Sequence, residues 1–158
     1  MLETANDQTG PRIKQISFFL RNRVGSLLSV VRELETANIG VCAVNILDSA
    51  DHAVIRMVVD RPAVALTILK EAGHAVFESD VLGVELPARE RFGVKKLLSA
   101  LLLAEVNVHY VYSLIPQCEQ RPVLALHVDD IPTAITVLRN HGLTLVGQDE
   151  ISLDFDSA

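Results

Sequence analysis

The sequence predicts an α+β fold made of two ferredoxin-like βαββαβ repeats, each an antiparallel sheet with its helices on one face. Strand-like and helix-like segments follow the same order in the two halves of the chain. In addition, VVDRPAVALTILKEAG (58–73) aligns with HVDDIPTAITVLRNHG (127–142). This alignment places Asp60 opposite Asp129 and Gly73 opposite Gly142, so the repetition holds at the level of single residues.

The first repeat begins with a strand over 14–20, a turn and a helix over 26–37. In the helix, four apolar residues fall at helical spacing and share one face, namely Leu27, Val30, Val31 and Leu34. Asp60 is placed to cap the second helix, with Pro62 in its first turn. The remaining elements are a strand over 41–47, a hairpin turn over 48–52, a strand over 53–60, a helix that ends at Gly73 and a strand over 74–80.

The second repeat has the same order of elements. They are a strand over 81–86, a turn over 87–93, a helix over 94–104, a strand over 106–115, a turn over 116–121, a strand over 122–130, a helix over 131–141 and a last strand over 143–151. The chain therefore divides into a flexible N-terminal segment (1–12), a first domain (13–79) and a second domain (80–153).

Composition excludes several classes of protein. The net charge of −6 disfavours a nucleic-acid or membrane-surface binder, which needs a basic field. No apolar run is long enough to span a bilayer, and the polar N-terminus does not resemble a signal peptide. Cys42 and Cys118 lie far apart, and the histidines form no metal-binding pair. We therefore expect a cytoplasmic protein with free thiols, no metal and no cofactor.

Two strands, 41–47 and 123–128, are apolar on both faces. Strands of this kind are usually covered on both sides. Because the helices of a repeat cover only one face of its sheet, the other face must meet the second repeat, a second chain or both. This pattern predicts a homodimer.

The residues that several activities of ferredoxin-like proteins require are missing from this sequence. The third strands carry no aromatic side chains for stacking RNA bases. The first turn has no CxxC for a metallochaperone, and the chain contains neither a P-loop nor a dinucleotide fingerprint. Arg23 and Asn45 leave an acylphosphatase-like enzyme open as an alternative.

The turn Asn22-Arg23-Val24-Gly25-Ser26-Leu27 resembles the [DN]-x-P-G-x-L turn of ACT domains, with Val24 in place of proline. After the helix, ANIGV (37–41) approximates the family's A-G-I-N-I motif with Asn and Gly exchanged. The second repeat is looser: RERFG (89–93) keeps the glycine, and AEVNV (104–108) keeps the apolar-Asn-apolar pattern. The resemblance spans nearly the whole chain as two tandem ACT domains.

The resemblance implies a stand-alone, non-enzymatic regulatory protein that binds a free amino acid where the first turn of one ACT domain meets a neighbouring domain. The free N–H groups at the start of helix 26–37 would receive the carboxylate, and Gly25 would allow close approach. The implied ligand-binding residues are Asn22, Arg23, Val24, Gly25, Ser26, Leu27, Asn38, Ile39, Phe92, Gly93 and Asn107. The implied partners are an amino acid, a second copy of the chain and an enzyme that it regulates.

Each of these residues also has a structural interpretation. Gly25 fits an ordinary turn, Asn22 a hydrogen bond within that turn, Asn38 a helix C-cap and Phe92 a core position. His109, Tyr110 and His127 fit either a ligand pocket or an ordinary interface. An ACT-type assembly module without a small ligand is therefore a second functional interpretation, alongside the acylphosphatase-like enzyme.

Overall fold

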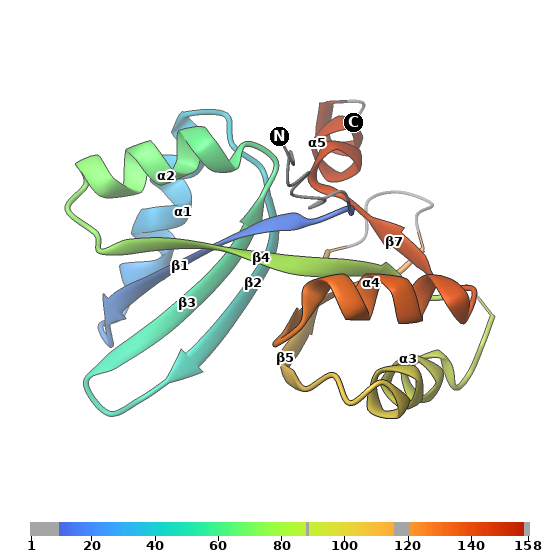
Figure 1. The fold of residues 1–158 in the computed structure, drawn as a ribbon. Coiled ribbons are helices and arrows are strands. Elements are labelled where there is room, and N and C mark those ends of the chain that lie inside the picture. The colour runs from blue at the N-terminus through green and yellow to red at the C-terminus, as the bar shows by residue number, and fades with distance from the viewer. Residues whose placement is uncertain (1–9, 88, 116–120, 157–158) are drawn as a thin grey trace, which may run out of the picture.

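The computed structural model describes residues 10–87, 89–115 and 121–156, in which seven strands and five helices are formed (Figure 1). The elements are β1 (Ile13–Arg21), α1 (Ser26–Thr36), β2 (Val41–Asp48), β3 (His52–Val59), α2 (Pro62–Glu71), β4 (Val76–Glu85), α3 (Gly93–Leu103), β5 (Val108–Ser113), β6 (Val123–Val128), α4 (Ile131–Asn140), β7 (Thr144–Val146) and α5 (Gln148–Asp156). This order confirms the predicted fold of two βαββαβ repeats.

The two repeats share the strand β4. The strand order is β2-β3-β1-β4-β6-β5, with β7 also paired to β4, and the pairings are antiparallel. The first half of β4 pairs with β1, for example Val76 with Phe18, and its second half pairs with β6 and β7. The separate strands predicted over 74–80 and 81–86 are thus one continuous strand, because no turn residue interrupts the chain at Asp80–Val81. The expected domain boundary falls inside it.

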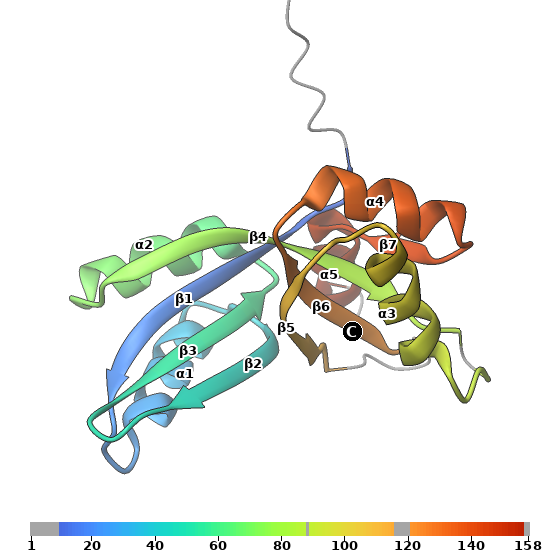
Figure 2. The ribbon, with the colours of Figure 1, turned by 60° about the horizontal axis from the view of Figure 1, so that its bottom comes forward.

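Each repeat buries its helices against one face of its own half of the sheet (Figures 1 and 2). In α1, Val30 and Leu34 are buried and Leu27 and Val31 pack at the margin of this core, as their helical spacing predicted. Four helices end on a residue with positive φ: Asn38 (56°), Gly73 (90°), Glu105 (58°) and Gly142 (74°). The backbone N–H of the residue after each of them donates to a carbonyl five positions back, a Schellman arrangement.

An aspartate before the second helix holds each repeat together in the same way. The N–H of Gly40 donates to Asp60 Oδ1 at 2.9 Å, and the N–H of Asp60 donates to the carbonyl of Gly40 at 3.1 Å. Asn107 and Asp129 form the equivalent pair at 3.0 and 3.2 Å. The predicted capping of α2 by Asp60 is wrong, because this carboxylate is engaged with Gly40 and Arg61 holds the N-cap position.

The last strand is shorter than predicted. Strand β7 covers only Thr144–Val146, and the chain continues after Gly147 into α5. Two acidic residues, Asp149 and Glu150, lie in the first turn of α5, where the helix dipole favours negative charge. Glu150 Oε1 also accepts the N–H of Gly147 at 3.1 Å. These features favour a helix over the predicted continuation of the strand to Ile151, which is buried.

The helix-free faces of the two halves pack against each other. Their shared core contains residues from every strand and from α5: Ile13, Cys42, Ala43, Val58, Val81, Tyr112, Leu114, Ala125, Val146 and Ile151. Strands β2 and β5, at the two ends of the strand order, also meet, since the N–H of Ile115 donates to the carbonyl of Cys42 at 2.7 Å. The other repeat therefore covers much of the face that the sequence left without a partner.

A buried amide links the two repeats at this junction. Gln15 on β1 is fully buried, and its Nε2 donates to the hydroxyl of Tyr110 at 2.6 Å. The hydroxyl of Tyr112 donates to Gln15 Oε1 at the same distance. Burial raises the pKa of Tyr112. Because a buried amide is costly without partners, these bonds fix how the second repeat sits on the first.

Beside this amide lies a stack of charged and aromatic groups. The guanidinium of Arg56 lies 3.9 Å from the centroid of the Tyr110 ring, which stacks on His127 at 4.9 Å. His109 lies 5.3 Å from His127. Burial, together with the nearby His109 and Arg56, lowers the pKa of His127. The stack therefore favours the neutral imidazole.

Replacing Gly83 by alanine tests how tightly the shared strand is packed. A Cβ there would lie 2.7 Å from the carbonyl oxygen of Val146, a backbone atom that cannot turn aside. We expect Gly83→Ala to lower the free energy of unfolding by about 1–3 kcal/mol, measured by urea denaturation. Gly93→Ala is the control, because its Cβ would meet Leu86 at an ordinary 3.6 Å and should leave stability equal or higher. Equal stability of both variants would contradict this packing.

The stack predicts loss of stability in mild acid. Because the folded state lowers the pKa of His127 from its ordinary 6.5, the unfolded chain takes up the proton first. The stability that neutral His127 contributes is complete above pH 6.5 and declines as the pH falls below this value. Asp80, whose pKa is lowered from 3.8, makes stability depend on pH only in more acidic solution. The melting temperature should therefore fall less between pH 7.5 and 5.5 in His127→Phe, which keeps a stacking ring, and equal falls would refute the assignment.

Candidate functional site

The first predicted turn is anchored to the hairpin between β2 and β3. Asn22 Nδ2 donates to Asp48 Oδ1 at 3.1 Å, and the N–H of Asn22 donates to the carbonyl of Asp51 at 3.2 Å. Asn22 therefore holds the turn in place through the neighbouring hairpin. The sequence did not indicate Asp48 and Asp51 as parts of this corner, since they lie far along the chain from Asn22.

The turn presents the N-terminus of α1 to solvent. Gly25 occupies the N-cap position with φ +84°, in the left-handed region, and no side chain of the described residues caps the helix there. Val24 is 107% exposed, and Asn22 and Arg23 are also exposed. Ser26 and Leu27, at the start of the helix, are half-buried. The N–H of Ser26 donates to the carbonyl of Arg23 at 3.2 Å and that of Ser29 to the carbonyl of Gly25 at 3.0 Å. The N–H groups of Leu27 and Leu28 are thus the first-turn amides available to an anionic group.

Asn38 and Ile39 lie at the other end of α1. Asn38 is exposed and has φ 56°, so it ends the helix one residue after the C-cap, which is Ala37 and not Asn38 as expected. Ile39 is a buried member of the first core. The length of the helix separates both residues from Gly25 by roughly 16 Å. Within one chain, the structure therefore does not bring the two halves of the predicted first site together.

The second turn does not repeat the backbone of the first. Phe92, with φ −117°, holds the N-cap position of α3, and Gly93 is already the first residue of the helix. Gly93 is buried, whereas Phe92 is 64% exposed, so the expected core position of Phe92 is not observed. The sequence aligned Gly25 with Gly93, but the residue at the N-cap position equivalent to Gly25 is Phe92, one residue before Gly93. Asn107 is exposed and uses its backbone to bind Asp129.

The two turns lie at opposite ends of the molecule. The first follows β1, whose last residues lie beyond the start of β4, and the second follows the end of β4 (Figures 1 and 2). A strand of this length separates them by roughly 30 Å. One ligand cannot contact both turns of the same chain.

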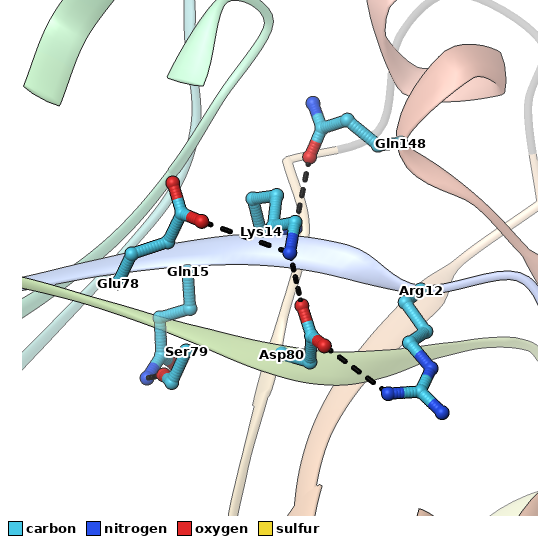
Figure 3. A network of polar contacts seen from close by, with 7 residues as sticks. All are labelled: Arg12, Lys14, Gln15, Glu78, Ser79, Asp80 and Gln148. Carbon is cyan, nitrogen blue, oxygen red and sulfur yellow. Dashed lines mark hydrogen bonds and ion pairs between the residues drawn. The ribbon is translucent and has the colours of Figure 1, made fainter. Parts of the chain in front are cut away.

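A polar network lies where β1, β4 and α5 meet (Figure 3). Asp80 accepts Lys14 Nζ at 2.7 Å and Arg12 Nη1 at 3.2 Å, and Gln148 Oε1 accepts the N–H of Lys14 at 3.0 Å. Partial burial acts to raise the pKa of Asp80, but the hydrogen bonds from Lys14 and Arg12 outweigh it and keep this pKa below 3.8. A shallow hollow beside the network is lined by residues 10–12 and 147–150. Arg12 Nε is buried without a hydrogen-bond partner among the described residues. Because Asp80 forms ion pairs with both Lys14 and Arg12, we assign this network a structural role.

The described part of the chain contains no group of three His, Cys, Asp or Glu residues suited to holding a metal ion. Among the same residues, no helix is long and apolar enough to cross a membrane. Burial raises the pKa of the Cys42 thiol to about 12, which makes it unreactive at neutral pH. Cys118 lies outside the described residues. Asn45 Oδ1 accepts Arg56 Nη1 at 3.4 Å, so the asparagine of the acylphosphatase-like alternative is already engaged.

The family model described as an ACT domain pair matches residues 11–153. Among solved structures, protein BT0572 from Bacteroides thetaiotaomicron is 28% identical with a TM-score of 0.81, over 89% of this chain and 96% of that one. The ligand-free regulatory subunit of aspartate kinase from Thermus thermophilus is 14% identical with a TM-score of 0.61, over 84% and 93% of the two chains.

A search of curated proteins finds no match. The matches that are found indicate no catalytic family. The family match covers both repeats, including the shared strand and the turns that precede α1 and α3. The chain therefore belongs to the ACT domain pair family.

Proposed function

We propose that this chain is a non-catalytic regulatory protein that binds a free amino acid at the turn 22–27, next to a domain of a second copy. The observation that carries the proposal is the uncapped, solvent-facing N-terminus of α1 behind a left-handed glycine. Such a terminus attracts a carboxylate through its free N–H groups and the helix dipole. The ACT family supports a regulatory role, because its members include regulatory subunits such as that of aspartate kinase.

The corner offers partners for both ends of an amino acid. The N–H groups of Leu27 and Leu28 in the first turn of α1 suit the carboxylate, and Gly25 has no neighbouring atom within 4 Å of where a Cβ would lie, which leaves room for a ligand. The carboxylate of Asp48, held beside the turn by Asn22, suits the ammonium group. Binding an amino acid through its carboxylate and ammonium groups needs neither a cofactor nor a catalytic side chain.

A second copy would supply the wall that this site lacks. Val24 is fully exposed, and Asn38, Phe92 and Asn107 are too far from the first turn to close it within one chain. We therefore propose a homodimer that acts on an enzyme in the cytoplasm and contacts neither nucleic acid nor membranes. A ligand-free assembly module is the second candidate, and the missing left-handed glycine at the second turn favours it for that half.

Gly25→Ala tests the proposed site. At φ +84° an alanine is strained by about 1–2 kcal/mol, and its methyl group would lie where the ligand approaches. We expect affinity for the bound amino acid to fall about tenfold or more, which corresponds to about 1.4 kcal/mol, in titration calorimetry. The amino acid itself is found by thermal shift, since ligand at one hundred times its Kd stabilises the protein by about 2.7 kcal/mol.

Gly73→Ala is the matched control. Gly73 has φ +90° and equally open surroundings, but it lies after the C-terminus of α2, whereas Gly25 lies before the N-terminus of α1. This variant should lose similar stability and keep the wild-type affinity. The absence of a shift with any amino acid would favour the assembly module, and equal losses of affinity in both variants would place the site elsewhere.

A further inference from the structure

Arg56 places a positive charge at the junction of the two repeats. It lies on β3, and strand β5 of the second repeat, which carries Tyr110, lies beside β2 and β3 there (Figure 2). The one hydrogen bond that its guanidinium makes to a described residue is the 3.4 Å contact from Nη1 to Asn45 Oδ1. No carboxylate of the described residues lies within ion-pair distance of Arg56. Because a half-buried charge without a counter-ion is costly, a bound anion would stabilise it.

The guanidinium is accessible to such an anion. Among the described residues, buried side-chain nitrogens without a hydrogen-bond partner occur only in Arg12 and His127, so the unpaired nitrogens of Arg56 reach solvent. A guanidinium presents its N–H groups in a planar fork that matches the two oxygens of a carboxylate. Arg56 therefore fits a carboxylate better than a monatomic anion.

Three hydroxyl groups converge next to Arg56. Gln15 Nε2 donates to Ser17 Oγ at 3.4 Å, to Ser79 Oγ at 3.2 Å and to Tyr110 Oη at 2.6 Å. Ser17 pairs with Arg56 across β1 and β3, and paired residues share a face of the sheet. The three oxygens accept from Gln15, and none of them donates to another described residue. Their O–H groups are therefore available to a bound carboxylate.

Apolar side chains continue along the same face of the sheet. Phe77 pairs with Ser17 and is 59% exposed, and Phe19 is 51% exposed and contacts Phe77 edge to face at 6.4 Å. Leu47 is 55% exposed and, like Phe19, pairs with Val54. The second repeat covers the inner part of this face and leaves these side chains in solvent. An exposed apolar patch beside a free cation is suited to a ligand that has both kinds of group.

We propose that this junction binds a small carboxylate that has an apolar body and no ammonium group. Its binding residues, the Arg56 cluster, are Arg56, the three hydroxyls and the exposed side chains of Phe19, Leu47 and Phe77. The carboxylate pairs with Arg56 and accepts from the hydroxyls, and the apolar body covers the two phenyl rings. The polar groups converge on one point, which suits a single carboxylate better than an extended protein surface.

The charge of the cluster decides against an amino acid. An ammonium group would lie beside the Arg56 cation, and no described carboxylate is close enough to pair with both. The turn 22–27 differs in this respect, since Asp48 is held beside it. The Arg56 cluster is therefore a second site with a different ligand class.

Titration with 3-phenylpropionate tests the site. The chain contains two tyrosines and no tryptophan, and both tyrosines bind Gln15 at this junction, so tyrosine fluorescence reports on it directly. We expect a saturable change in fluorescence. The uncharged 3-phenylpropanamide and L-phenylalanine, which adds an ammonium group, should each produce it with at least about tenfold weaker affinity. Equal affinity for all three compounds would overturn the pairing with Arg56.

Two pairs of variants test the two parts of the cluster. Arg56→Gln should weaken binding of 3-phenylpropionate about tenfold or more, whereas Arg139→Gln, which removes an exposed charge on α4, should keep the wild-type affinity. Leu47→Ser should weaken it about threefold or more, whereas Leu102→Ser, at an exposed leucine of α3, should not. Circular dichroism melting shows whether each variant is folded, and the Leu47 pair decides the outcome if Arg56→Gln does not fold.

The outcomes separate the Arg56 cluster from the proposed site at the turn. No tyrosine response to 3-phenylpropionate or to the aliphatic acid hexanoate would overturn the cluster. Binding that is lost in Gly25→Ala and kept in Arg56→Gln would also overturn it and place the acid at the turn. A tyrosine response that is lost in Arg56→Gln, in a protein that binds no amino acid in calorimetry, would support the cluster and overturn the site at the turn.

Discussion

The strand β4 is the constraint on which the rest of the molecule depends. Its first half completes the sheet of the first repeat, and its second half begins the sheet of the second. Because one backbone serves both sheets, the repeats cannot rotate freely about a linker, and their helix-free faces close on a common core. Gln15 then fixes the mutual orientation through two tyrosines of the other repeat, since a buried amide tolerates few alternative arrangements. Helix α5 fastens the same joint from outside, where Ser152 donates to the carbonyl of Asp60.

This joint also fixes the positions of the two turns relative to each other. A continuous strand keeps the turns before α1 and α3 at its two far ends, so their relative position is set by β4 rather than by a flexible hinge. Two ligand sites in one chain would therefore be independent unless a second chain connects them. A response to a ligand then requires a change in how copies associate or in how a partner reads the exposed corner, because only a state that the ligand binds more tightly becomes more populated.

The sequence predicted what depends on local periodicity and missed what depends on distant contacts. Helical spacing and helix-ending glycines located four helices, and the matched aspartates revealed the repeat. The hydrogen-bond partner of the Asp60 carboxylate could not be predicted from the sequence. Pairing in the sheet brings Gly40 beside Asp60, and the carboxylate binds Gly40 instead of capping its own helix. At the site, Gly25 was predicted from its motif and has the left-handed backbone such a turn needs. Gly93 was aligned with Gly25 only because both are glycines, whereas the backbone of Gly93 is the first residue of helix α3.

The two repeats differ both in the turn before their first helix and in the exposed residues at the end of that helix. The first repeat keeps a left-handed glycine and a helix N-terminus without a side-chain cap, and the last residues of its helix are the exposed Glu35 and Thr36. The second replaces the glycine at the N-cap by Phe92, and its helix exchanges Glu35 and Thr36 for two leucines. Tandem repetition thus allows the two copies of the fold to differ at the turn before the first helix while both keep the same order of strands and helices.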